Sequence, residues 1–271
     1  MKNFIRNQPH IIICSQPPWL EPYCEGEFCL KPKTSLEISS KDALVITDIQ
    51  NDFLPGGALP VLDGNLVIPV LNDYIKMFNK AKATIIASRD WHPANHISFV
   101  TKGGSWPPHC VQNSEGAKFS PDLKLPEIVL VVSKAMDPKK EAYSIFDGTG
   151  LGEKLKAEGI KRILIGGLAA EYCVLNSVLD ARKMGMETYV LSDATKGLNV
   201  KSGDVDRAFE TMTLRGAKLV TVADFPEPDP LSGEVSPEEV EGDKPLDEND
   251  VKKKARMKAK GAYDRVRRER G

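Results

Sequence analysis

The stretch Arg162-Ile163-Leu164-Ile165-Gly166-Gly167-Leu168-Ala169-Ala170-Glu171-Tyr172-Cys173-Val174 joins an apolar run to an amphipathic one. Its first four residues have the character of a strand, two glycines follow, and the amphipathic pattern continues to about Met184. Cys173 stands near the start of the expected helix, where the positive end of the helix dipole favours a thiolate. The alternative is that Cys173 is a small buried hydrophobic residue, as most free cysteines are.

The same alternation of apolar and amphipathic segments runs through most of the chain. Apolar runs with strand-like composition occupy residues 43–47, 84–88, 128–133, 162–165, 188–191 and 218–222. Helix-like segments lie at residues 65–81, 151–158, 172–184 and 204–215. Strands that are apolar throughout are buried on both faces, as in parallel sheets covered by helices. The sequence therefore predicts an α/β fold, a three-layer sandwich with a six-stranded, mainly parallel sheet flanked by helices.

Two other expected strands end in residues that a thiol nucleophile needs. Asp48 follows residues 43–47, and Lys134 follows residues 128–133. In an open parallel sheet, the carboxyl ends of the strands face one crevice. We therefore expect the carboxylate, the amine and the thiol of Cys173 to meet there.

Three of the four histidines of the chain fall close together in the sequence. Asp90 and His92 follow the second expected strand at a spacing of two, which places both side chains on the same side of an extended chain. His109 lies further along a stretch, residues 91–125, that is rich in proline, glycine and histidine, and long loops of this kind are usually functional. Imidazole and carboxylate ligands together suit zinc, iron or manganese. His96 is a candidate for a fourth ligand or for a residue that supports a ligand.

The overall composition is that of an ordinary soluble enzyme. The chain has 271 residues and a net charge of −1, which gives no reason to expect nucleic acid or a membrane as a partner. No apolar run is long enough to span a bilayer, and the N-terminus lacks a convincing signal peptide. The cysteines form no metal-finger pairs, which favours a reducing, cytoplasmic location. They are Cys14, Cys24, Cys29, Cys110 and Cys173.

The two ends of the chain differ in composition from its centre. Residues 1–40 form a proline-rich extension, residues 41–228 form the expected α/β domain, and residues 229–271 form a charged tail. Residues 229–250 contain nine acidic residues and one lysine, whereas residues 251–271 contain ten basic and two acidic residues. We expect the tail to be disordered or partly helical. Its basic run is a nuclear localisation signal, an anchor to an anionic surface, or a solvated appendage.

Five motifs together resemble the nicotinamidase branch of the isochorismatase-like cysteine hydrolases. The resemblance covers about residues 43–225, with the motifs in order and sensibly spaced, and implies that residues 41–228 are a hydrolase domain of this family. The matching segments are Asp48-Ile49-Gln50-Asn51-Asp52-Phe53, Arg89-Asp90-Trp91-His92-Pro93-Ala94-Asn95-His96-Ile97-Ser98-Phe99, Trp106-Pro107-Pro108-His109-Cys110-Val111, Lys134 with Asp137-Pro138 and Tyr143-Ser144-Ile145-Phe146, and Gly167-Leu168-Ala169-Ala170-Glu171-Tyr172-Cys173-Val174.

The resemblance implies a catalytic triad and an oxyanion site. Cys173, Asp48 and Lys134 occupy the positions of the triad. Such a triad hydrolyses an amide through a thioester on the cysteine. In this mechanism the backbone N–H groups of Ala169 and Cys173 would hold the oxyanion. The peptide bond between Leu168 and Ala169 matches a position at which a cis bond is usual in the family.

The resemblance also implies one divalent metal ion. Its ligands would be Asp90, His92 and His109, with His96 variably involved. Zinc is the first expectation, and iron and manganese are the alternatives. The metal is expected to orient the substrate through its pyridine nitrogen.

The substrate implied by the resemblance is nicotinamide, hydrolysed to nicotinate and ammonia in NAD salvage, with pyrazinamide as an analogue. Phe53, Trp106 and Tyr143 match positions that enclose the substrate ring, and Tyr172, at a position that varies among members, is added to this pocket. Trp106 could equally pack as a core residue. The alternative function is hydrolysis of a different small amide by the same fold. The sequence leaves open whether the protein forms a homo-oligomer.

Overall fold

The computed structural model of the chain describes residues 36–226. The expected charged tail, residues 229–271, and most of the expected extension, residues 1–40, lie outside the described residues. The interpretation of the basic run as a targeting signal lies outside them too. Among the helices that the structure describes, none combines the length and the apolar character needed to cross a membrane.

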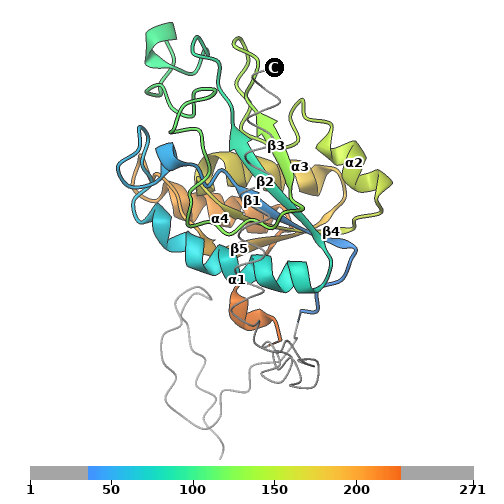
Figure 1. Ribbon diagram of the computed structural model, residues 1–271. Coiled ribbons are helices and arrows are strands. Elements are labelled where there is room, and N and C mark those ends of the chain that lie inside the picture. The colour runs from blue at the N-terminus through green and yellow to red at the C-terminus, as the bar shows by residue number, and fades with distance from the viewer. Residues whose placement is uncertain (1–35, 227–271) are drawn as a thin grey trace, which may run out of the picture. The chain divides into compact units, whose positions relative to one another are not determined.

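The predicted sheet is confirmed, and all five of its strand pairs are parallel. Its six strands lie in the order β3-β2-β1-β4-β5-β6 (Figure 1). The strands are β1 (Asp42–Thr47), β2 (Thr84–Asp90), β3 (Leu130–Lys134), β4 (Arg162–Gly167), β5 (Glu187–Thr195) and β6 (Lys218–Val220). The helices are α1 (Val67–Lys80), α2 (Leu151–Ala157), α3 (Leu175–Lys183) and α4 (Asp204–Leu214).

Two hydrophobic cores, one on each face of the sheet, produce the three layers. Leu44 and Ile46 of β1 belong to the core that α1 covers, together with residues such as Leu71. Ala43 and Val45, on the other face of the same strand, belong to the core that contains apolar residues of α2, α3 and α4. Successive side chains of a strand point to opposite faces, so β1 can be apolar throughout and still be fully buried. Figure 1 shows α1 on one side of the sheet and α2 and α3 on the other.

The expected helix at residues 172–184 is two elements. A π-helical turn, η4 (Ala170–Val174), comes first, and α3 continues from it. Single π-turns of this kind are frequent at functional sites. The other helical turns are of the 3-10 type and lie at η1 (Asn51–Phe53), η2 (Gly64–Leu66), η3 (Val100–Lys102) and η5 (Val222–Asp224).

The chain direction across the sheet reverses between β1 and β4. From β1 the chain moves outward through β2 and β3, and it then returns to β4 on the other side of β1. A crevice outside the carboxyl ends of the strands is expected at such a point. Asp48 follows β1 directly and Cys173 follows β4, so both lie at this edge of the sheet.

Gly167 allows the close approach of β4 to β1 at this edge. Its φ is +121°, a value that residues with a side chain rarely adopt. A Cβ atom there would lie 2.2 Å from the carbonyl oxygen of Thr47, the last residue of β1. A side chain could therefore be accommodated only if the two strand ends separated.

We expect Gly167→Ala to lower the free energy of unfolding by about 3 kcal/mol or more, because it combines overpacking with a forbidden backbone conformation. Gly148→Ala is the matched control, since Gly148 also has a positive φ, but a Cβ atom there would meet none of the described residues within 4 Å. It should cost only about 1–2 kcal/mol. Urea unfolding followed by circular dichroism measures both free energies. Equal losses in the two variants would contradict the role of Gly167 in the close approach of β4 to β1.

Candidate active site

The side chain of Lys134 brings three chain segments together. It is the last residue of β3, and its Nζ atom lies 2.9 Å from Oδ2 of Asp48 and 3.1 Å from Sγ of Cys173. All three side chains are buried. Asp48 has a φ of +51°, an uncommon conformation for a residue other than glycine. The structure thus places the three groups expected from the sequence within one hydrogen-bonding cluster.

Lys134 has a further partner that sequence reasoning missed. Its Nζ atom lies 2.5 Å from Oδ1 of Asp90, the last residue of β2. The sequence predicts Asp90 only as a metal ligand. The register of the sheet pairs Asp90 with Lys134 directly, but a sequence does not reveal which strands are neighbours.

The charges of this cluster shift the pKa values of its members. Burial alone would lower the pKa of Lys134, but Asp48 and Asp90 outweigh burial, so the pKa is raised well above its usual value. Burial raises the pKa of Asp48, and Lys134 only partly offsets this effect. The hydroxyl of Ser88, in β2, donates a hydrogen bond of 2.7 Å to Oδ1 of Asp48 and favours its carboxylate form. Lys134 is therefore a fixed cation, whereas Asp48 is a carboxylate that readily accepts a proton.

The pKa of Cys173 is raised well above its usual value. Burial is the main cause, the carboxylates of Asp48 and Asp90 add to it, and Lys134 offsets only part of it. The expectation that the start of the helix favours a thiolate is therefore wrong. Two neighbouring anions and the loss of water outweigh the helix dipole, so the thiol is protonated at rest.

Backbone donors lie in the segment that carries the thiol. The peptide bond between Leu168 and Ala169 is cis. Within residues 36–226, no acceptor takes the N–H of Ala169. Cys173 lies in the first turn of η4, where N–H groups have no acceptor inside the helix. Both N–H groups are thus available to bind an anionic oxygen.

A second cluster next to the thiol site has the composition of a metal site. Asp90, His92 and His109 each offer a ligand atom within 4.8 Å of the others, and all three are buried. Neither ring nitrogen of His92 has a hydrogen-bond partner among the described residues. The Nδ1 atom of His109 is engaged by the carbonyl oxygen of Pro107 at 2.8 Å, which leaves Nε2 to face the cluster. An unpartnered buried imidazole is costly, so these residues fit a bound cation.

His96 lies beside this cluster but makes different contacts. Its ring centroid is 4.3 Å from that of His92. Its Nδ1 atom lies 2.7 Å from the hydroxyl of Ser98, and its Nε2 atom lies 3.0 Å from the carbonyl oxygen of Lys140. Both nitrogens of His96 are therefore occupied by the protein, and the residue packs against His92.

The aromatic residues expected around the substrate form two groups. The Nε1 atom of Trp106 donates a hydrogen bond of 3.1 Å to the hydroxyl of Tyr143. The ring of Tyr172 lies 5.1 Å from that of Trp106 and 5.4 Å from that of Tyr143, measured between centroids. Phe53 is separate from these three and lies 5.4 Å from the ring of His109. The structure therefore places one aromatic residue beside the candidate metal ligands and three others in contact with each other.

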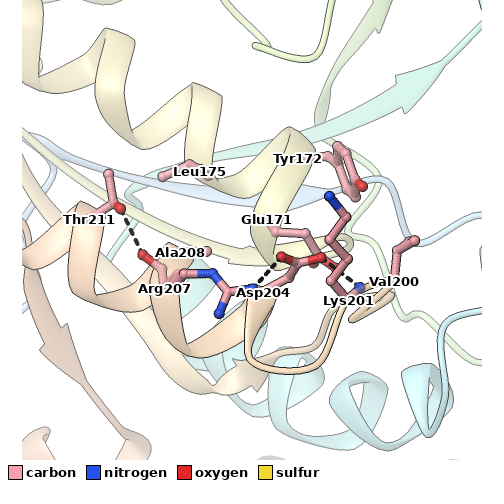
Figure 2. Close-up of a pocket in the computed structure, with 9 residues that line it drawn as sticks. All are labelled: Glu171, Tyr172, Leu175, Val200, Lys201, Asp204, Arg207, Ala208 and Thr211. Atoms are coloured by element: carbon pink, nitrogen blue, oxygen red, sulfur yellow. Dashed lines mark hydrogen bonds and ion pairs between the residues drawn. The ribbon is translucent and has the colours of Figure 1, made fainter.

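A hollow of about 380 Å³ lies between η4, α3 and α4 (Figure 2). The carboxylate of Asp204 is paired with Arg207 at 2.7 Å and with the backbone N–H of Lys201 at 2.8 Å. Oε1 of Glu171 accepts a hydrogen bond from the backbone N–H of Asn199, which ties the loop after β5 to η4. Tyr172 lines this hollow, whereas Cys173, Lys134 and Asp48 do not.

Comparison with known proteins places this geometry in a family. Residues 42–224 match the family model described as the Isochorismatase domain. The nicotinamidase of Escherichia coli is 38% identical over an alignment of 206 residues, and the match covers 68% of this chain and 97% of that protein.

Two solved structures resemble the described fold. The pyrazinamidase of Pyrococcus horikoshii, solved in complex with zinc, is 52% identical, with a TM-score of 0.64 over 67% of this chain and 99% of that chain. PnC1 from L. infantum, solved in complex with nicotinate, is 34% identical, with a TM-score of 0.66 over 71% of this chain and 98% of that chain. Because the family match spans the whole sheet and the thiol cluster, the chain belongs to the isochorismatase domain family.

Proposed function

We propose that the protein is a nicotinamide amidohydrolase, which converts nicotinamide and water to nicotinate and ammonia in NAD salvage. The observation that carries the proposal is the buried contact of Lys134 with both Asp48 and Cys173, beside the cluster of Asp90, His92 and His109. The similarity to the E. coli nicotinamidase over 97% of that protein supports the same substrate.

In the first step, Asp48 acts as the general base. It accepts the proton from Sγ of Cys173, and the thiolate attacks the carboxamide carbon. Its raised pKa suits this role, because a more basic carboxylate takes a thiol proton more readily. Lys134 keeps its charge throughout and stabilises the thiolate as it forms.

The attack converts the carbonyl oxygen into an oxyanion. In this proposal the N–H groups of Ala169 and Cys173 would hold this oxygen, and a donor of this kind contributes roughly 3–4 kcal/mol in comparable sites. When the intermediate collapses, the C–N bond breaks. Asp48 returns its proton to the leaving nitrogen, ammonia departs, and a thioester remains on Cys173.

The thioester is then hydrolysed with Asp48 again as the base and Cys173 as the leaving group. Asp48 accepts a proton from a water molecule, whose oxygen attacks the thioester carbon. Collapse of the second intermediate breaks the C–S bond and releases nicotinic acid, which loses its remaining proton to solvent to give nicotinate. The proton on Asp48 returns to the thiolate, which restores the starting state.

The residues of the second cluster fit a divalent metal ion, for which zinc is our first candidate and iron and manganese are alternatives. Asp90, His92 and His109 would hold it, and the unpartnered nitrogens of His92 support this assignment. The ion would supply a Lewis acid that binds and orients the pyridine nitrogen. His96 supports the ring of His92 in this proposal.

The aromatic residues would enclose the pyridine ring. Phe53 lies beside His109, and in this proposal Trp106, Tyr143 and Tyr172, which contact one another, would form another wall. Flat rings favour offset or edge contacts with aromatic side chains, so such a pocket selects planar heteroaromatic amides.

An assay of ammonia release tests the function, with nicotinamide, pyrazinamide and a small aliphatic amide as substrates. Hydrolysis of the aliphatic amide alone would favour a different amidohydrolase of the same family.

We expect Cys173→Ala to lower kcat by about 10⁴-fold or more, because it removes the nucleophile. Binding of the metal and of nicotinamide should persist, as measured by metal analysis and calorimetry. Cys110→Ala is the matched control, since Cys110 is also a buried free thiol but is not among the polar partners of Lys134, which are Asp48, Asp90 and Cys173. Ready turnover by the Cys173 variant would exclude the thioester route.

We expect His92→Ala to weaken metal binding by at least about 100-fold. Removal of residues that support metal ligands costs about 10–100-fold in affinity, and loss of a ligand itself should cost at least as much. His96→Ala should weaken it less, since both of its ring nitrogens already bind protein groups. Metal content after dialysis against a chelator distinguishes the two variants. Equal losses would make His96 a ligand as well.

We expect Ser88→Ala to shift the acidic limb of the kcat/KM profile upward by about one pH unit. The Ser88 hydroxyl lowers the pKa of Asp48, so its removal raises that pKa further and the basic form persists only at higher pH. Ser133→Ala is the control, because its hydroxyl accepts a hydrogen bond from Arg89. An unmoved acidic limb in the Ser88 variant would argue against Asp48 as the base.

A further inference from the structure

The carboxylate of Asp90 is shared between the two clusters. Its Oδ1 atom lies 2.5 Å from Nζ of Lys134, whereas its Oδ2 atom lies 3.7 Å from Nε2 of His92. Asp90 is buried, and its ion pair with Lys134 stabilises the carboxylate form. Its orientation therefore determines the position of the lysine on one side and of the candidate metal ligands on the other.

The backbone of Asp90 lies beyond the end of the pairing between β1 and β2, so β1 offers it no hydrogen-bond partner. The pairing of β1 with β2 ends at Thr47 and Ser88, because the chain turns away at Asp48. On its other side β2 remains paired with β3 as far as Asp90 and Lys134. Without a substitute for β1, the N–H and carbonyl groups that Asp90 directs to that side would be buried and unpaired, which is costly.

The side chain of Gln50 takes the place of the missing strand. Its Oε1 atom accepts a hydrogen bond of 2.8 Å from the backbone N–H of Asp90, and its Nε2 atom donates one of 2.8 Å to the backbone carbonyl of Asp90. The second proton of Nε2 goes to the carbonyl oxygen of Ala117 at 2.9 Å. Gln50 has no exposed surface, and its amide uses both donors and its acceptor.

We propose that Gln50 is a positioning residue, which sets the direction of the Asp90 carboxylate and thereby couples the candidate metal site to Lys134. The primary amide pairs with the backbone of Asp90 as a neighbouring strand would. The additional bond to Ala117 fixes the strand end against the loop that leads away from His109. This inference rests on the proposed metal site and adds to it a residue that contacts neither substrate nor metal.

Gln50→Glu is a sharp test, because the two side chains have nearly the same shape. A carboxylate would face the carbonyl oxygens of Asp90 and Ala117 with acceptors in place of donors. Gln112→Glu is the matched control. The Nε2 atom of Gln112 donates a single hydrogen bond of 2.9 Å to the carbonyl oxygen of Trp91, which follows Asp90 in the chain. The side chain of Gln112 is only half-buried.

The experiment measures zinc affinity by competition with a chromophoric chelator, in the full-length protein and in each variant, alongside thermal unfolding. We expect Gln50→Glu to weaken zinc binding about 10–100-fold, as removal of residues that support metal ligands generally does. The Gln112 variant should bind zinc nearly as tightly as the unaltered protein. At saturating zinc, kcat of the Gln50 variant should remain low with KM little changed, because Asp90 also holds Lys134.

Different outcomes separate the possible failures. If Gln50→Glu lowers only the unfolding temperature and leaves zinc affinity unchanged, Gln50 is structural and the positioning role is overturned. If the unaltered protein binds no zinc, iron or manganese, both the metal site and this role fail, while ammonia release still tests the hydrolase activity. Should Gln50→Glu not fold, Gln50→Met, which introduces no charge, is judged by the same zinc affinities.

Discussion

The burial of one ammonium group organises the active edge of this protein. Lys134 has almost no exposed surface, and an isolated charge in such a position would be very unfavourable. It is stabilised because Asp48 and Asp90 lie on two of its sides and the Cys173 thiol lies on a third. Loss of Lys134 would leave two buried carboxylates without a counter-charge, so electrostatics as well as packing hold these groups together.

The same electrostatics explain how a buried thiol can be both stable and reactive. Burial and two carboxylates keep Cys173 protonated, and its proton can leave only toward a nearby base. Asp48 is that base in the proposed mechanism, while Lys134 limits the cost of the thiolate. Asp90 extends the network to His92 and His109, so the triad and the candidate metal site share one carboxylate rather than standing as independent sites.

Much of this organisation could be predicted from local patterns. Apolar runs and amphipathic segments indicated the strands and the α-helices, their order along the chain and their approximate bounds. The apolar runs were recognisable because parallel strands are buried on both faces. Asp48, Asp90 and Lys134 also stood at or next to predicted strand ends. The boundary near Cys173 was less predictable, since a single π-turn of five residues is too short to change the amphipathic pattern of the helix that follows it. The pKa of the thiol was mispredicted for a related reason, because a helix start is visible in the sequence whereas the neighbouring carboxylates are not.

The sequence by itself determined which groups are available: a thiol, a carboxylate and an amine after three strands, and a run of histidines in one loop. Only the tertiary structure decided the partners of each group. Strand order pairs Asp90 with Lys134, and the end of β1 makes Gln50 complete the sheet. Protein partners occupy both ring nitrogens of His96, which distinguishes it from His92 although the two rings pack together. Periodicity reports which face of an element is buried, but contacts between distant segments arise only when the strands are laid side by side.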